Sequence, residues 1–138
     1  MALTDREAIG ELKARYCRFL DLKRWDDWRD LFTDDFVLDT TEAGGPSVIC
    51  GRDAAVSMVR GSIETVKTAH HVHAGEIAIS GDTATGIWAM QDRLIFDGGA
   101  GMIGYGHYTE TYVKQDGEWK IARSKLTRLM VETTGPGA

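Results

Sequence analysis

Three of the four histidines in this chain lie together, in the segment His70-His71-Val72-His73. Histidine exchanges a proton most readily near neutral pH, so a pocket histidine held by a carboxylate is the usual general base. A zinc site needs three or four ligands on preorganised elements, and no second cluster of cysteine and histidine completes one. The cluster therefore predicts proton transfer and no metal site.

An acidic residue, Asp92, falls among large apolar residues in Thr83–Asp97, a segment with the alternating pattern of a strand. Alternate side chains share one face of a strand, so Asp92 is predicted to point toward the core. A buried carboxylate needs hydrogen-bond donors or a shifted pKa, which makes Asp92 a structural acceptor or a pocket acid or base. The same alternation places Arg128 with Leu126 and Met130, so a purely structural Asp92–Arg128 ion pair is the alternative.

Tyr16 and Asp21 lie five residues apart in a predicted helix, about 140° around its axis, so they flank one corner. Tyr16 falls on the apolar stripe and is by default a core tyrosine. Asp21 lies in the last turn, where the helix dipole does not favour an acid. This mismatch favours another role for Asp21. His107, in a later strand, is a second-rank pocket candidate.

The elements that position these residues follow from periodicity and caps. The sequence Thr4-Asp5-Arg6-Glu7 has the form of a capping box and begins a helix predicted over 5–22. A short second helix is marked by Trp25, Trp28, Leu31 and Phe32, a strand starts at Phe36, and a third helix follows Gly51-Arg52-Asp53.

From Ala69 onward the pattern changes to period two, and three turn signals separate four predicted strands. The turn signals are Gly81-Asp82, Gly98–Gly101 and Asp116-Gly117. Helices first and a long antiparallel meander afterwards predict an α+β fold, with the helices on one face of a curved sheet. Thr133–Ala138 is predicted to be a loose tail.

Two motifs are set aside. The sequence Gly99-Ala100-Gly101-Met102-Ile103-Gly104 matches Gly-x-Gly-x-x-Gly, but a strand follows it instead of a helix, so we expect no dinucleotide and no other cofactor. Cys17 and Cys50 do not make a disulfide framework, and neither has the sequence context of a nucleophile.

Composition excludes several classes of function. The 138 residues carry 16 basic and 21 acidic side chains, a net charge of −5, and 43% hydrophobic residues, which predicts one domain over 1–138 with room for one pocket. No basic run suits a nucleic-acid backbone. No apolar run approaches about 20 residues and the N-terminus is charged, so we expect no membrane span and no signal peptide. The lack of a disulfide framework favours a reduced, cytoplasmic setting.

Taken together, these residues resemble the SnoaL-like branch of the nuclear transport factor 2-like superfamily, over essentially the whole chain. The resemblance is carried by the helix with Tyr16 and Asp21, the segment Trp25–Trp28, His70 before a strand, Asp92, and the hairpin Asp116–Ile121. It implies a cone-shaped curved antiparallel sheet with N-terminal helices packed on it, the cystatin-like α+β barrel. The more specific match is to the scytalone dehydratase, bile acid 7α-dehydratase and hexachlorocyclohexane dehydrochlorinase group, which shares an Asp–His dyad.

The resemblance assigns roles to five residues. Asp21 and His70 match the dyad, with His71 as an alternative one residue away. His70 would abstract a proton while Asp21 holds its ring, and Tyr16 would polarise a carbonyl or assist a leaving hydroxyl. Asp92 would orient or protonate a leaving group, and Arg128 would neutralise charge on an oxygen or bind a carboxylate.

The remaining features of the resemblance concern the pocket. Where scytalone dehydratase has a second tyrosine, this chain has Thr40, and its second pocket histidine falls near Asp92, which argues against a shared substrate. An apolar, ring-sized ligand is expected. The candidate wall residues are Trp88, Met90, Leu94, Phe96, Tyr105, His107 and Met130.

The leading hypothesis is a cofactor-independent, dehydratase-like lyase acting on a hydrophobic cyclic or polyketide-like molecule. The alternatives are an isomerase or polyketide cyclase in the same pocket, with Asp92 as the base, or a non-catalytic ligand-binding or assembly module. The resemblance also implies a homo-oligomer, a trimer or a dimer.

Overall fold

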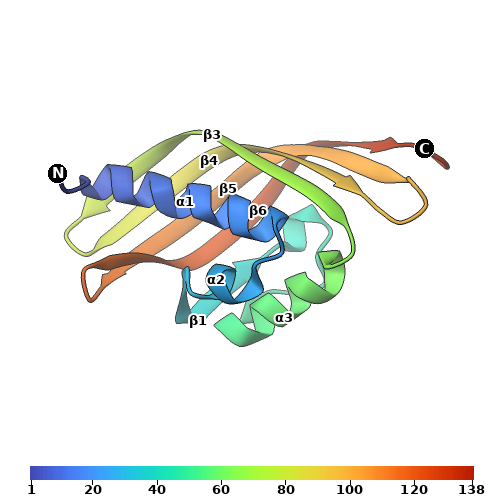
Figure 1. The fold of residues 1–138 in the computed structure, drawn as a ribbon. Helices are drawn as coiled ribbons and strands as arrows, with labels where there is room; N and C mark the ends of the chain where they lie inside the picture. The colour runs from blue at the N-terminus through green and yellow to red at the C-terminus, as the bar shows by residue number, and fades with distance from the viewer.

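In a computed structural model that describes all 138 residues, helices pack on one face of a curved, unclosed six-stranded sheet (Figure 1). The helices are α1 (Asp5–Asp21), α2 (Trp25–Arg29), the 3-10 helix η1 (Thr41–Ala43) and α3 (Arg52–Ile63). The strands are β1 (Phe32–Asp39), β2 (Ile49–Cys50), β3 (Lys67–Ser80), β4 (Thr83–Ile95), β5 (Gly101–Gln115) and β6 (Glu118–Thr134). This arrangement confirms the predicted α+β class.

The strands lie in the order β2-β1-β6-β5-β4-β3, so the predicted meander β3–β6 forms most of the sheet. Every neighbouring pair is antiparallel except β1 with β6. This parallel pairing begins at Phe32, opposite Ile121, and starts β1 four residues before the predicted Phe36. Leu31 and Phe32 are therefore not part of the second helix, because pairing with β6 outweighs their helical spacing.

The end of β6 also differs from prediction. Thr133 and Thr134 were expected in a loose tail, but they pair with Met102 and Gly101 of β5. Strand β6 is therefore long enough to carry the end of the sheet beyond the helices (Figure 1).

Helix α1 is fixed at both ends. The predicted capping box is confirmed: Glu7 N donates to Thr4 Oγ1 at 3.1 Å, and Thr4 N donates to Glu7 Oε1 at 3.3 Å. At the other end, Lys23 N donates to Leu20 O and Arg24 N donates to Phe19 O, which is a Schellman motif.

The left-handed residue of that motif is Lys23, with φ of 59°. Glycine usually occupies this position, and a residue with a Cβ costs on the order of 1 kcal/mol there. Lys23 is therefore held in a strained conformation at the end of α1.

A charged pair lies in the centre of the core. Lys13 Nζ donates to Glu110 Oε2 at 2.8 Å, and both side chains are fully buried. Tyr112 Oη and Ser124 Oγ also donate to Glu110, at 2.8 and 2.6 Å. Lys13 Nζ lies 3.6 Å from the ring centroid of Tyr16 and 3.7 Å from that of Tyr108. Every charge in this cluster thus has a partner, which makes its burial tolerable.

Removing one partner of this pair should destabilise the fold strongly. Lys13→Met leaves Glu110 buried without its cation, and we expect the free energy of unfolding to fall by about 3–5 kcal/mol in urea denaturation. The double variant Lys13→Met/Glu110→Gln should regain a large part of this loss. Glu64→Gln breaks the exposed Arg60–Glu64 pair and is the control, for which no measurable change is expected. If Lys13→Met were no more destabilising than Glu64→Gln, the buried charge of Glu110 would not need its cation.

Candidate active site

A cavity of about 530 Å³ lies between the helices and the inner face of the sheet. Its polar end is formed by Tyr16, His70, Asp92, Tyr108 and Arg128. The rest of its wall is largely apolar and comes from α1, β1, α3, β4, the residue after β4, and β6. These residues are Leu20, Leu38, Met58, Val59, Ile63, Leu94, Phe96 and Leu126. The loop between β1 and β2 completes the wall with Thr40, Ala43, Gly44, Gly45 and Pro46.

Asp21 and His70 form a tight pair at this end. Asp21 Oδ1 lies 2.7 Å from His70 Nδ1, and Asp21 Oδ2 accepts from the backbone N–H of His70 at 2.8 Å. The His70 side chain is 9% exposed and that of Asp21 is 22% exposed, so water competes little for the bond. A carboxylate only accepts hydrogen bonds, so the ring hydrogen lies on Nδ1. In the neutral ring, Nε2 then carries the lone pair.

Asp92 lies opposite His70 in the β3–β4 ladder, and Arg128 holds it from the other side. Arg128 Nη1 and Nη2 donate to the two carboxylate oxygens at 2.6 and 2.8 Å, a bidentate pair that raises the pKa of Arg128. His70 Nε2 is 3.9 Å from Asp92 Oδ2, too far for a hydrogen bond. Asp92 is therefore committed to Arg128, and His70 Nε2 is not tied to it.

A glycine makes the Asp92–Arg128 pair possible, because the two residues come from β4 and β6 with β5 between them. Gly104 of β5 pairs with Asp92, and a Cβ on it would overlap the guanidinium of Arg128. The glycines that superficially match a dinucleotide motif thus include one that clears space for an ion pair.

Tyr16 and Tyr108 are kept in the phenol form by their surroundings. Burial raises the pKa of both hydroxyls well above 10, and the negative charge of Glu110 adds to the effect on Tyr16. Their rings lie 5.7 Å apart in an edge contact, with Lys13 against both. Tyr16 is therefore suited to donate a hydrogen bond into the cavity and not to act as a base.

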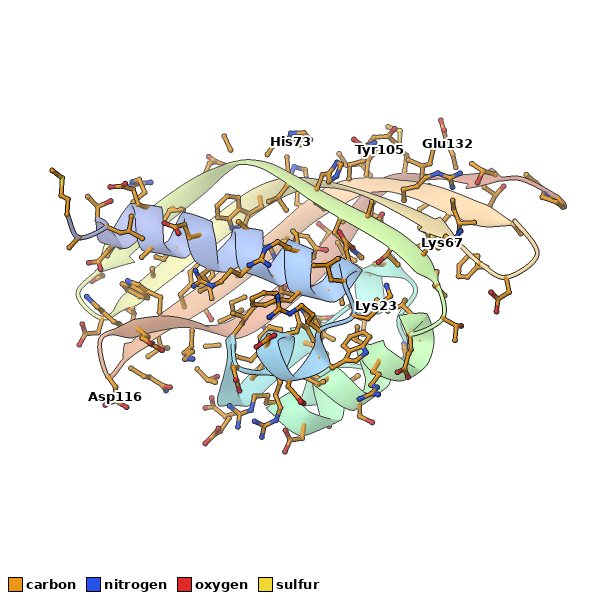
Figure 2. The ribbon with its side chains drawn as sticks, viewed as in Figure 1. Lys23, Lys67, His73, Tyr105, Asp116 and Glu132 are labelled. Carbon is orange, nitrogen blue, oxygen red and sulfur yellow. The ribbon has the colours of Figure 1, made fainter.

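The structure brings together all five predicted catalytic residues, and it resolves which histidine contacts Asp21. His71 is exposed and pairs with Gln91, so its side chain lies on the outer face of the sheet. His73 is also exposed, and Figure 2 shows it with Tyr105 on the side of the sheet away from α2 and α3.

Of the predicted wall residues, Leu94 and Phe96 line the cavity and five others do not. Trp88 lies deeper in the core, where its Nε1 donates to Tyr112 Oη at 2.8 Å, and Met90 lies behind the ion pair, with its Sδ 3.7 Å from Arg128 Nη1. Tyr105 and His107 alternate with the inward-facing Tyr108 and so point outward.

Met130 is the fifth, and a bulge explains the error. Arg128 pairs with Gly106, whereas Met130 pairs with Tyr105, so Leu129 is an extra residue in β6. An extra residue inverts the alternation, which carries Met130 to the outer face, where it is 57% exposed.

Sequence reasoning missed several residues around the site. Glu110 falls between two inward-facing tyrosines, so the alternation that identified Asp92 would also have identified it. Lys13, Lys23 and Thr68 gave no such signal, because their contacts join segments that are far apart in the chain.

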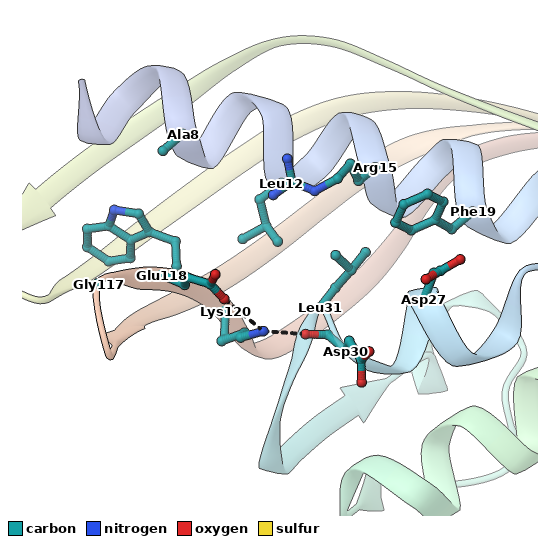
Figure 3. Close-up of a pocket in the computed structure, with 11 residues that line it drawn as sticks. Ala8, Leu12, Arg15, Phe19, Asp27, Asp30, Leu31, Gly117, Glu118 and Lys120 are labelled. Carbon is teal, nitrogen blue, oxygen red and sulfur yellow. Dashed lines mark hydrogen bonds and ion pairs between the residues drawn. The ribbon is translucent and has the colours of Figure 1, made fainter. Parts of the chain in front are cut away.

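A second cavity of about 490 Å³ lies under α1, away from His70 (Figure 3). Its wall includes Arg15, Asp27 and Trp119, and Lys120 reaches across it to donate to the Asp30 carbonyl at 2.6 Å. It contains no residue of the predicted site. No helix is both long and apolar enough to cross a membrane, and no group of three or more His, Cys, Asp or Glu residues is placed to hold a metal.

Comparisons with known proteins identify the family and support the fold. The SnoaL-like domain model matches residues 1–125. A probable cyclase, FGR4, from Gibberella zeae is 28% identical over 94% of this chain and 95% of its own length. A proposed scytalone dehydratase from Novosphingobium aromaticivorans is 27% identical, covers 96% of this chain and 89% of its own, and superimposes with a TM-score of 0.83.

A further solved structure supports the fold alone. An NTF2-like protein with a cystatin-like fold, also from Novosphingobium aromaticivorans, is 21% identical and has a TM-score of 0.75, with 97% of this chain and 84% of its own covered. The expected cystatin-like architecture is thereby confirmed.

The buried tyrosines predict how the protein responds to high pH. Folding raises the pKa values of Tyr16, Tyr108 and Tyr112, so the stability they contribute is complete below pH 10 and is lost as the pH rises above it. A titration followed by near-ultraviolet absorbance should show at most one of the four tyrosines ionising before the protein unfolds. Ionisation of two or more in the folded state would contradict the burial of this cluster.

Proposed function

This chain belongs to the SnoaL-like domain family, and we propose that it is a cofactor-independent, dehydratase-like lyase with His70 as the general base. The observation that carries the proposal is the pair at the end of the cavity. Asp21 is hydrogen-bonded to Nδ1 of His70, and Nε2 lies beside an apolar cavity without a hydrogen bond to Asp92. Such a pair is arranged to take a proton from a bound molecule.

The proposed reaction removes water from a β-hydroxy carbonyl compound. His70 Nε2 takes a proton from the carbon next to the carbonyl, and the electron pair of that C–H bond forms the C=C bond as the C–O bond breaks. The leaving hydroxide takes a proton from the imidazolium and departs as water, which returns His70 to its starting form. Asp21 stabilises the imidazolium while it exists.

Tyr16 would stabilise the negative charge that develops on the carbonyl oxygen. Its raised pKa keeps the hydrogen on the phenol oxygen, so it can donate to that oxygen throughout. Asp92 would orient the substrate with Arg128 and not act as the acid or base, because both its oxygens accept from the guanidinium. This arrangement also argues against Asp92 as the base of an isomerase.

The cavity favours a neutral, ring-shaped substrate. Its volume of about 530 Å³ and largely apolar wall suit a molecule of two or three rings. Arg128 is already paired with Asp92, so the polar end offers no unpaired cation to a substrate carboxylate. A neutral cyclic or polyketide-like hydroxy ketone therefore fits better than an acid.

A cyclase is the second candidate, and the similarity to the probable cyclase FGR4 favours it. The same His70 would remove a proton, and the resulting carbanion would attack a carbonyl carbon of the same molecule in place of expelling hydroxide. The two reactions share the base and differ in whether water leaves.

The test is a panel of neutral bicyclic β-hydroxy ketones in D₂O, followed by NMR. Both candidate reactions predict loss of the α-hydrogen, and only the lyase gives a conjugated ketone and water. His70→Gln and Asp21→Asn should each lower kcat/KM by about 10²–10⁴-fold, because general base catalysis contributes on that order.

The adjacent residue provides a matched control. His71→Gln changes the exposed neighbour and should leave kcat/KM unchanged while the fold, followed by circular dichroism, is the same in all variants. Turnover retained in folded His70→Gln would contradict the proposal. Binding of these ketones without any loss of the α-hydrogen would instead support a ligand-binding module.

A further inference from the structure

The Asp21 carboxylate is held by more than its histidine. Oδ1 accepts from His70 Nδ1 and also from Thr68 Oγ1, which lies 2.9 Å away at the start of β3. Thr68 is two residues before His70, so both side chains lie on the same face of the strand as Asp21. The direction of the Thr68 hydroxyl therefore bears directly on the acceptor that fixes the His70 ring.

Lys23 determines that direction. Its Nζ lies 2.7 Å from Thr68 Oγ1. An ammonium group only donates hydrogen bonds, so Thr68 must accept from Lys23, and its single hydrogen is then directed at Asp21. The bonds run one way, from Lys23 to Thr68 to Asp21, and Asp21 is left to accept from His70.

Lys23 occupies a position that its backbone disfavours. It is the left-handed residue that ends α1, where glycine would relieve the strain, and Figure 2 shows it at that end of the helix. Partial burial also lowers the pKa of its ammonium, against the opposing effect of Asp21. Strained backbone positions cluster at functional sites, and this one carries a partly desolvated charge beside Asp21.

We propose that Lys23 and Thr68 are positioning residues that keep Asp21 as the acceptor for His70 Nδ1–H, and so keep Nε2 available as the base. This inference rests on the proposed function, in which His70 is the base. Neither residue lines the cavity, so the two residues act through Asp21.

The experiment is ¹⁵N NMR of the histidine rings in the full chain, with His70 assigned by the loss of its signals in His70→Gln. The wild-type ring should show hydrogen on Nδ1, exchanging slowly with water. Thr68→Val removes the hydroxyl at nearly constant volume, and we expect the Nδ1 hydrogen to exchange about tenfold faster, with a new population carrying hydrogen on Nε2. Thr68→Ser keeps the hydroxyl and should behave as the wild type.

Lys23→Gly separates positioning from a purely structural role. Glycine relieves the left-handed strain, so the melting temperature should rise by a few degrees, while the His70 signals should change as in Thr68→Val. With a substrate in hand, kcat should fall by about tenfold at unchanged KM. A more stable protein with wild-type His70 signals would overturn the proposal, because Lys23 would then only end the helix.

The two proposals fail in distinguishable ways. In one case, His70→Gln abolishes turnover but Thr68→Val and Lys23→Gly leave both kcat and the His70 signals unchanged. The positioning role of Lys23 and Thr68 is then wrong, and His70 remains the general base. In the other case, the His70 signals respond as expected but no panel compound loses its α-hydrogen. Lys23 and Thr68 then do orient the His70 ring, but their role in catalysis is overturned together with the proposed function.

Discussion

The buried ion pair between Lys13 and Glu110 determines where α1 lies on the sheet, and the site depends on that placement. It joins residues 97 positions apart, with both side chains withdrawn from water. Burying two charges costs several kcal/mol each, about enough to cancel their attraction, so the pair is tolerated only where its remaining bonds are satisfied. Few placements of α1 meet that condition. In the observed one, Asp21, about two turns further along the helix, reaches β3 at His70.

The other half of the site is set by strand pairing. His70, Asp92 and Gly104 are direct cross-strand neighbours on three successive strands, and Arg128 reaches back to Asp92 across the glycine. Distances along such a row are fixed by backbone hydrogen bonds and need no further adjustment. The reactive arrangement therefore combines a rigid row on the sheet with one carboxylate delivered by a helix end.

Alternation along the strands predicted much of this arrangement, including the inward positions of Asp92 and Arg128. It failed at Met130 because a bulge is a feature of the pairing of two strands and leaves no mark in one of them. The segment after Thr40 and the α3 side chains in the cavity wall could not be predicted either, because their positions come from packing between distant segments. The parallel pairing of β1 with β6 also joins distant segments, and it explains why β1 begins four residues before the predicted start.

The bulge at Leu129 also has a consequence for how the length of this chain can vary in evolution. Arg128 is held in register from the β5–β6 turn, so losing Leu129 would remove the bulge, leave Arg128 facing Asp92 and keep Met130 opposite Tyr105. Losing one residue between Ser124 and Arg128 would carry the guanidinium to the outer face and dissolve the ion pair. Deletions are thus tolerable on the C-terminal side of Arg128 and disruptive on the other, although both segments belong to one continuous strand.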